Sequence, residues 1–157
     1  DDTKLHGGNG RNRGVDGARQ HTADDVRRNA VVLKNPLGDE YSTMRTQLVT
    51  NMLTVLSTNI NRKNPDSRYF EINRIYLPKE LPSKEQPQEV PSLCIGLYGK
   101  EETFFTLKGM VEEVFALFNC KADFEKSNEP YYHPGRQATA SYNGNVIARL
   151  GEIHPAT

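Results

Sequence analysis

The segment Arg68-Tyr-Phe-Glu-Ile-Asn-Arg-Ile-Tyr-Leu-Pro78 and the apolar stretch before it, which runs to Arg62, decide the fold of this chain. Aromatic and β-branched residues dominate 68–77, which favours a strand. Their alternation is imperfect, as expected for a central strand that is buried on both faces. The preceding stretch predicts an amphipathic helix, because its apolar residues recur at three- and four-residue steps. These residues are Met44, Leu48, Val49, Met52, Val55, Leu56 and Ile60.

The ends of this helix are marked by residues with known end preferences. We expect it to begin at Ser42 or Thr43, since both residue types are good N-caps. We expect it to end at Arg62, because Pro65 follows closely and a proline stops a helix. Ahead of it, the apolar run 29–35 predicts a short strand that ends in a turn at Asn35-Pro36.

The second half of the chain predicts further strands and one more helix. Four prolines between residues 78 and 91 indicate a solvated loop, and the apolar segment 92–98 indicates a strand. Thr106 is expected to cap the second helix, and a short strand is expected around Phe124. The apolar stripe of that helix consists of Leu107, Met110, Val111, Val114, Phe115 and Phe118.

The strongest hairpin signal lies near the end of the sequence. Asn143-Gly144 separates the apolar segments 137–142 and 145–150, and this dipeptide favours a two-residue type I′ turn. Hairpin strands with helices between them indicate an α+β fold, with a mostly antiparallel sheet flanked by helices.

Composition limits the class of protein. The 157 residues suit one domain, and twenty basic residues balance twenty acidic ones, so nothing in the charge balance predicts a nucleic-acid or acidic-membrane partner. Residues 1–25 are rich in Gly, Asn and charge and are expected to be a flexible or atypical segment ahead of a domain at 26–157. Cys94 and Cys120 lie in apolar surroundings, which indicates buried reduced thiols. No signal peptide or membrane span is apparent, so we expect a cytoplasmic protein.

Four stretches carry a family resemblance through their order and spacing. They are Asn35-Pro-Leu-Gly38, Met44-Arg-Thr46, Asn61-Arg-Lys-Asn64 leading to Arg68-Tyr-Phe-Glu-Ile72, and His133-Pro-Gly-Arg136 continuing to Gly151-Glu-Ile-His-Pro155. From about Val26 to Pro155 the chain resembles the class II synthetase-like core module of the bacterial phenylalanyl-tRNA synthetase β chain. Thr50 departs from it, since relatives often have proline there, and the first 25 residues do not match.

The resemblance implies a heterotetramer of two α and two β chains. In that family the α chain activates phenylalanine with ATP and charges the tRNA, while the core-like module of the β chain packs against α. The implied partners are therefore the α subunit and, through the assembled complex, tRNA. No cofactor is expected in this chain, although ATP and magnesium are implied for the assembled enzyme.

The sequence also indicates that this core has lost its chemistry. Adenylate formation needs a cation at the α-phosphate, and class II synthetases supply an arginine near the end of a strand. Leu77 and Pro78 stand there in this chain, and the second arginine motif would lie beyond Pro155. We therefore expect the chain alone to be inactive and to act as a scaffold for the catalytic α subunit.

Two surfaces are candidates for contacts with partners. One side of the long helix could meet helices of the α subunit, although the same residues could be buried in the chain's own fold; they are Leu48, Met52, Val55, Leu56 and Asn59. Arg62, Lys63 and Arg68 could contact the tRNA backbone, although cations are favourable at a helix end in any case.

Other residues have plainer interpretations. His133 and His154 precede prolines and are interpreted as turn formers, not as metal ligands, because no further ligands converge on them. Arg136 and Arg149 are interpreted as salt-bridge residues, not as phosphate ligands. Two alternative functions stay open: a stand-alone enzyme that binds ATP or an amino acid, and an RNA-binding module, against which the neutral charge argues.

Overall fold

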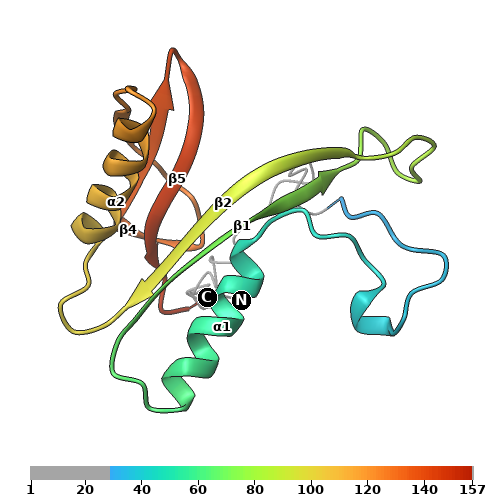
Figure 1. Cartoon of the computed structure of the whole chain (residues 1–157), viewed down its shortest axis with the longest axis horizontal. Coiled ribbons are helices and arrows are strands. Elements are labelled where there is room, and N and C mark those ends of the chain that lie inside the picture. Colours follow the sequence, from blue (N-terminus) through green and yellow to red (C-terminus); the bar gives the residue numbers. More distant parts are fainter. Residues whose placement is uncertain (1–28, 157) are drawn as a thin grey trace, which may run out of the picture.

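The computed structural model describes residues 29–156, and it is an α+β fold, as the sequence predicts. Its strands form two antiparallel sheets, a two-stranded β1–β2 ribbon and a three-stranded β3–β4–β5 sheet. Helix α1 lies against the ribbon, and α2 lies against the second sheet (Figure 1). In chain order the elements are η2 (Asp39–Tyr41), α1 (Val49–Asn61), β1 (Ser67–Leu77), β2 (Gln88–Tyr98), α2 (Phe104–Leu117), β3 (Asp123–Lys126), β4 (Tyr132–Tyr142) and β5 (Asn145–Ile153).

The β1–β2 ribbon pairs in an unbroken register from Ser67 opposite Tyr98 to Leu77 opposite Gln88. Gly96 lets α1 approach it closely, because a Cβ at this position would lie only 2.6 Å from Cγ of Met52 and 2.9 Å from Cδ1 of Leu56. Met52 and Leu56 are accordingly buried. The ribbon therefore buries one face against α1.

The first helix begins at Val49, so the predicted start at Ser42 or Thr43 is wrong. The preceding residues are used in extended pairing instead. Thr43 forms an isolated β-bridge with Val32, and the carbonyl of Arg45 accepts the N–H of Tyr76 on β1. Long-range backbone hydrogen bonds thus outweigh local capping preference in this segment.

Two strand predictions also need correction. The strand expected over 29–35 is reduced to the single bridge at Val32, with exposed Val32 and Leu33 side chains. The loop expected over 78–91 is shorter, because β2 begins at Gln88 and includes Pro91. Pro91 lies opposite Arg74, whose backbone N–H points away from β2, so its missing N–H interrupts no hydrogen bond of the ribbon.

The second unit is a three-stranded sheet covered on one face by α2. Ala138, Ala140 and Leu150 form its buried core, against which side chains of α2 pack, including Leu107, Val111 and Phe115. Thr103, not the predicted Thr106, is the N-cap of α2, and the two threonines form a reciprocal capping box. Phe118, predicted to belong to the buried stripe, lies at the C-cap and is exposed.

The predicted hairpin and the short strand around Phe124 are confirmed. Asn143 and Gly144 have positive φ values of 50° and 77°, as a type I′ turn requires. The strands extend beyond the predicted segments, and the register shifts between Tyr132 and Gln137, where the His133-Pro-Gly135 sequence lies. No helix among residues 29–156 has the length and apolar character needed to cross a membrane.

Candidate functional site

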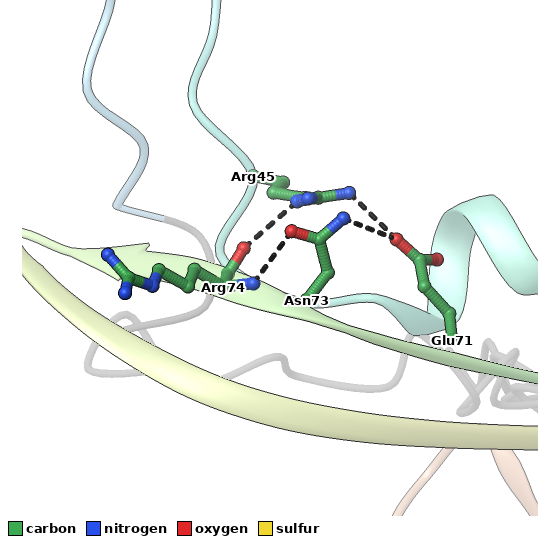
Figure 2. Close-up of polar contacts among 4 residues, drawn as sticks. All are labelled: Arg45, Glu71, Asn73 and Arg74. Atoms are coloured by element: carbon green, nitrogen blue, oxygen red, sulfur yellow. Dashed lines mark hydrogen bonds and ion pairs between the residues drawn. The ribbon is translucent and has the colours of Figure 1, made fainter.

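A cluster of polar side chains fastens the segment before α1 to the outer edge of β1 (Figure 2). Nε of Arg45 donates to the backbone carbonyl of Arg74 at 3.0 Å, and Nη1 lies 2.9 Å from Oε1 of Glu71. The amide of Asn73 joins the same carboxylate at 3.3 Å, and its Oδ1 accepts the N–H of Arg74 at 2.9 Å. We call these four residues the Arg45 clip. They fix where the chain enters α1 relative to the ribbon.

The face of the ribbon opposite α1 carries large apolar side chains. Phe70 is 72% exposed and Ile72 is 70% exposed, and Leu93, which lies opposite Ile72 on β2, is also exposed. We call these three residues the apolar face. Monomeric proteins rarely leave neighbouring large apolar side chains bare without a binding role.

Arginines flank the apolar face, and acidic side chains pair with both of them. Nε of Arg68 lies 2.7 Å from Oε1 of Glu102, and Nη1 of Arg74 lies 2.6 Å from Oε2 of Glu89. Arg68, a predicted tRNA-contact residue, is therefore engaged within the chain. Arg62 and Lys63 are exposed at the end of α1, as expected for a helix end.

The predicted subunit-interface residues divide into two groups. Leu48, Met52 and Leu56 are buried within this chain. Val55 is 43% exposed, and Asn59 is half-buried, its side chain donating to the backbone carbonyl of Val55 at 2.9 Å. Of the five predicted interface residues, Val55 and Asn59 are therefore the ones with accessible surface.

Among residues 29–156, the cations that lie near the end of β1 in sequence, where a catalytic arginine was sought, are all paired with carboxylates. Leu77 pairs with Gln88, and Arg74, the nearest arginine before it, is bound to Glu89. A hollow of about 310 Å³ lies in the adjoining loop, and its lining cation, Lys79, is paired with Glu85 at 3.1 Å. A negatively charged phosphate would have to displace one of these pairs, so the arrangement does not favour adenylate chemistry.

The histidines and the two C-terminal arginines take the plainer roles. Nδ1 of His133 accepts the N–H of Gly135 at 3.2 Å, and Nδ1 of His154 accepts the N–H of Ala156 at 3.0 Å. Arg136 pairs with Glu152, and Arg149 pairs with Glu129. Across the described range 29–156, no three His, Cys, Asp or Glu side chains converge as metal ligands would.

The thiol of Cys94 is suited to packing and not to nucleophilic chemistry. Burial raises its pKa, and the negative charge of Glu71, which lies opposite it on β1, adds to that rise. A thiol with a raised pKa stays protonated at neutral pH, and the thiolate is the nucleophile. Cys94 is therefore a weak candidate for covalent catalysis.

Reasoning from the sequence missed the Arg45 clip and the apolar face. Arg45 fell inside the predicted helix, and its partner Glu71 lies 26 residues away, so no local pattern joins them. The apolar face had one available signal. A proline within a strand, here Pro91, indicates an edge strand, and an edge strand argues against a central position for the hairpin.

Comparison with known proteins places the chain among relatives of one kind. Residues 15–157 match the family described as the phenylalanyl tRNA synthetase beta chain CLM domain, beginning ahead of Val26, where the resemblance was expected to start. The chain is 40% identical to a phenylalanine–tRNA ligase beta subunit of Clostridium tetani over 134 residues, which cover 84% of this chain. It is 36% identical to that of Clostridium acetobutylicum and 34% identical to that of Geobacter sulfurreducens, each again over 84% of this chain. It spans 17–18% of the length of these relatives.

Proposed function

The chain belongs to the phenylalanyl tRNA synthetase beta chain CLM domain family, and from that premise we propose that it is a non-catalytic core module that supports a catalytic α subunit. In this proposal the α subunit carries out phenylalanyl-tRNA synthesis with ATP and magnesium, and this chain binds no cofactor of its own. In this proposal tRNA binds to the assembled cytoplasmic complex.

The observation that carries this proposal is the chemistry at the end of β1. Leu77 and Pro78 close the strand, and the cations nearest to them in sequence, Arg74 and Lys79, are held by carboxylates. Loss of one preorganised electrostatic group typically costs on the order of a hundred- to a thousand-fold in rate. A chain that has this fold but lacks a free cation at the end of β1 is better suited to binding a partner than to catalysis.

The accessible side of α1 is the part of the predicted interface that supports a contact with α. Val55 offers an exposed apolar side chain next to Asn59, while the opposite side of the helix is occupied by the ribbon. An apolar anchor of this kind, surrounded by polar helix residues, is typical of a helix that packs against partner helices. Arg62 and Lys63 extend the same helix end and are proposed as a minor tRNA-backbone contact.

Co-purification with a phenylalanyl-tRNA synthetase α subunit tests the proposal. We expect a stable complex with the unchanged chain and a weakened complex with Val55→Asp. Val146→Asp is the matched control, because Val146 is 49% exposed on β5, far in sequence from α1, and receives the same charge. Met52→Asp is unsuitable, because Met52 is buried and a charge there would unfold the chain.

Two outcomes would contradict the proposal. A chain that is folded by circular dichroism and binds no α subunit at micromolar concentration is not a scaffold for it. Equal weakening by Val55→Asp and Val146→Asp would show that the contact does not use α1. A binding assay with ATP and the isolated chain adds a separate check, since saturable binding would favour the alternative enzyme function.

A further inference from the structure

The turn between β4 and β5 leaves one peptide bond unusually accessible. Tyr142 pairs with Asn145 across the turn, and Asn143 and Gly144 fill it with φ values of 50° and 77°. Both turn residues are exposed. A Cβ placed on Gly144 would meet no heavy atom within 4 Å beyond its chain neighbours. The space beside the Asn143-Gly144 peptide bond is therefore open.

The backbone amide of Gly144 is also free. In a two-residue hairpin turn the flanking residues bond to each other, and the N–H of the second turn residue has no partner in the turn. Gly144 accordingly donates no hydrogen bond to any other residue within 29–156. Glycine has no Cβ to crowd its nitrogen when a neighbouring group approaches. The carboxamide of Asn143 is thus followed by an unhindered amide nitrogen, with which it can close a five-membered ring.

We propose that Asn143 is a modification site, at which spontaneous deamidation converts the asparagine to aspartate or isoaspartate. The amide nitrogen of Gly144 attacks Cγ of Asn143, forms a new C–N bond and loses its proton. The C–N bond of the carboxamide breaks, and its nitrogen takes up a proton and leaves as ammonia. One water molecule then opens the resulting succinimide ring at either of its two carbonyl carbons. Water is the single co-reactant.

Three other exposed asparagines show why this combination matters. Asn145 lies in the same hairpin, but the β-branched Val146 follows it and crowds the attacking nitrogen. Asn64 precedes a proline, which has no N–H to lose. Asn119 has a positive φ of 53°, yet the N–H of the next residue, Cys120, is already hydrogen-bonded to α2. Each of the three lacks an unhindered and unbonded nitrogen after it.

The two products affect the hairpin differently. Aspartate keeps the normal backbone, and Asp-Gly favours the same type I′ turn as Asn-Gly. Isoaspartate routes the backbone through the side-chain carbon, which adds one methylene to a tight two-residue turn. Both products bring a negative charge to the turn. We therefore expect isoaspartate, and not aspartate, to weaken the pairing of Tyr142 with Asn145.

The loosening is expected to stop where the register of β4 and β5 shifts, between Ala140 and Ser141. Residues 141–147 are exposed or half-buried, whereas Ala140 and Leu150 belong to the core that α2 covers. The tip of the hairpin can therefore open while the rest of the sheet stays packed. This inference goes beyond the proposed contact with the α subunit and does not depend on it, because that contact uses α1.

Peptide mapping of the folded 157-residue chain after days in mildly alkaline buffer tests the proposal. Trypsin releases residues 137–149 as one peptide, and fragmentation separates Asn143 from Asn145. We expect Asn143 to deamidate at least about tenfold faster than Asn145, because glycine leaves its nitrogen uncrowded. An isoaspartate-specific methyltransferase should label the same peptide. The other Asn-Gly pair of the sequence begins at Asn9, outside the described residues, and lies in a different tryptic peptide.

Amide hydrogen exchange separates the effect of isoaspartate from that of the added charge. In the aged chain the amides of Tyr142 and Asn145 should lose protection, whereas that of Leu150 should keep it. Freshly prepared Asn143→Asp is the matched control, because it carries the same charge on a normal backbone, and it should protect all three amides. An Asn143 that stays intact in the folded chain would overturn the proposal, whether or not it reacts in urea. So would equal rates at Asn143 and Asn145.

Discussion

The two sheets of this chain differ in which side chains they expose on the face that no helix covers. In the β3–β4–β5 sheet, the face toward α2 carries Ala138, Ala140 and Leu150, and the opposite face carries polar residues such as Thr139 and Arg149. In the β1–β2 ribbon, α1 covers one face, but the opposite face carries Phe70 and Ile72. Alternation of apolar and polar residues is the usual pattern of a sheet with one solvated face.

We call α2 and the β3–β4–β5 sheet the complete region, because a helix closes its core. The α1–ribbon unit, in contrast, has features of a binding surface. The core of the second sheet is closed by α2, and its other face mixes polar residues with exposed apolar ones such as Ile147 of β5. The ribbon keeps its outer face apolar and one stretch of edge open, and both features cost solubility unless a partner covers them. The binding surfaces of the chain are therefore expected on the α1–ribbon unit.

The largest expected effect lies in the complete region. Leu150 is 2% exposed, so Leu150→Ala should lower the free energy of unfolding by about 3 kcal/mol, through lost burial and the cavity it leaves. Ile72→Ala should change it by less than about 0.5 kcal/mol, because Ile72 is already in water. Urea denaturation at low protein concentration measures both. Equal losses would mean that the apolar face is covered within the chain, and the comparison would fail.

A second prediction concerns the contact between α1 and the ribbon. Gly96→Val should cost about 2 kcal/mol, because the new side chain overlaps Met52 and Leu56 and forces the helix away. Gly109→Ala is the control in α2, where an added Cβ meets nothing within 4 Å. That change should stabilise the chain by up to about 1 kcal/mol through helix propensity. A neutral Gly96→Val would show that α1 does not pack closely on β2.

The Arg45 clip predicts a smaller effect. Arg45→Met keeps the side-chain stem but removes the hydrogen bonds to Arg74 and Glu71, and should cost about 1 kcal/mol. Arg62→Met, at the exposed end of α1, should be nearly neutral. A double-mutant cycle with Glu71→Gln measures the coupling between Arg45 and Glu71, and strict additivity would show that they do not interact.

The smallest effect concerns the pH dependence of Cys94. Burial and then Glu71 raise the pKa of this thiol, so alkylation by iodoacetamide at pH 8 should be slower in the folded chain than in urea. The folded state keeps the proton to a higher pH than the unfolded state. The contribution of this protonated thiol to the free energy of unfolding is therefore fully present below the thiol's ordinary pKa. It is lost as the pH rises above that value. Mass spectrometry of the Cys94 peptide across a pH series measures the rate, and equal rates in both states would contradict this assignment.

The complete region was also the predictable one. Asn143-Gly144 marks its hairpin locally, and the three–four spacing of Leu107, Val111 and Phe115 marks the helix that covers it. The start of α1 was mispredicted because Ser42 and Thr43 look like caps, while the residues around them are held by strands far away in sequence. The family could be recognised from motif order, and the match to residues 15–157 confirms it.

The candidate site was harder to predict for a physical reason. Periodicity shows which residues share a face of an element, but not which face is covered. Leu48, Met52 and Leu56 were weighed equally as interface or core, and the structure buries all three. The close approach that buries Met52 and Leu56 depends on Gly96, 40 residues beyond Leu56. The exposure of Phe70 and Ile72 likewise depends on what lies beside the ribbon and not on their own sequence.

The order of the two units along the chain gives the open edge of β1 a consequence during synthesis. The ribbon leaves the ribosome before α2 and the β3–β4–β5 sheet, because it precedes them in sequence. At about 5–20 residues per second, residues from Gly99 to Ala156 take roughly 3 to 12 s to follow. For those seconds each nascent chain presents its edge to its neighbours on the same messenger RNA. The edge of the ribbon is therefore accessible to other molecules before the chain is released.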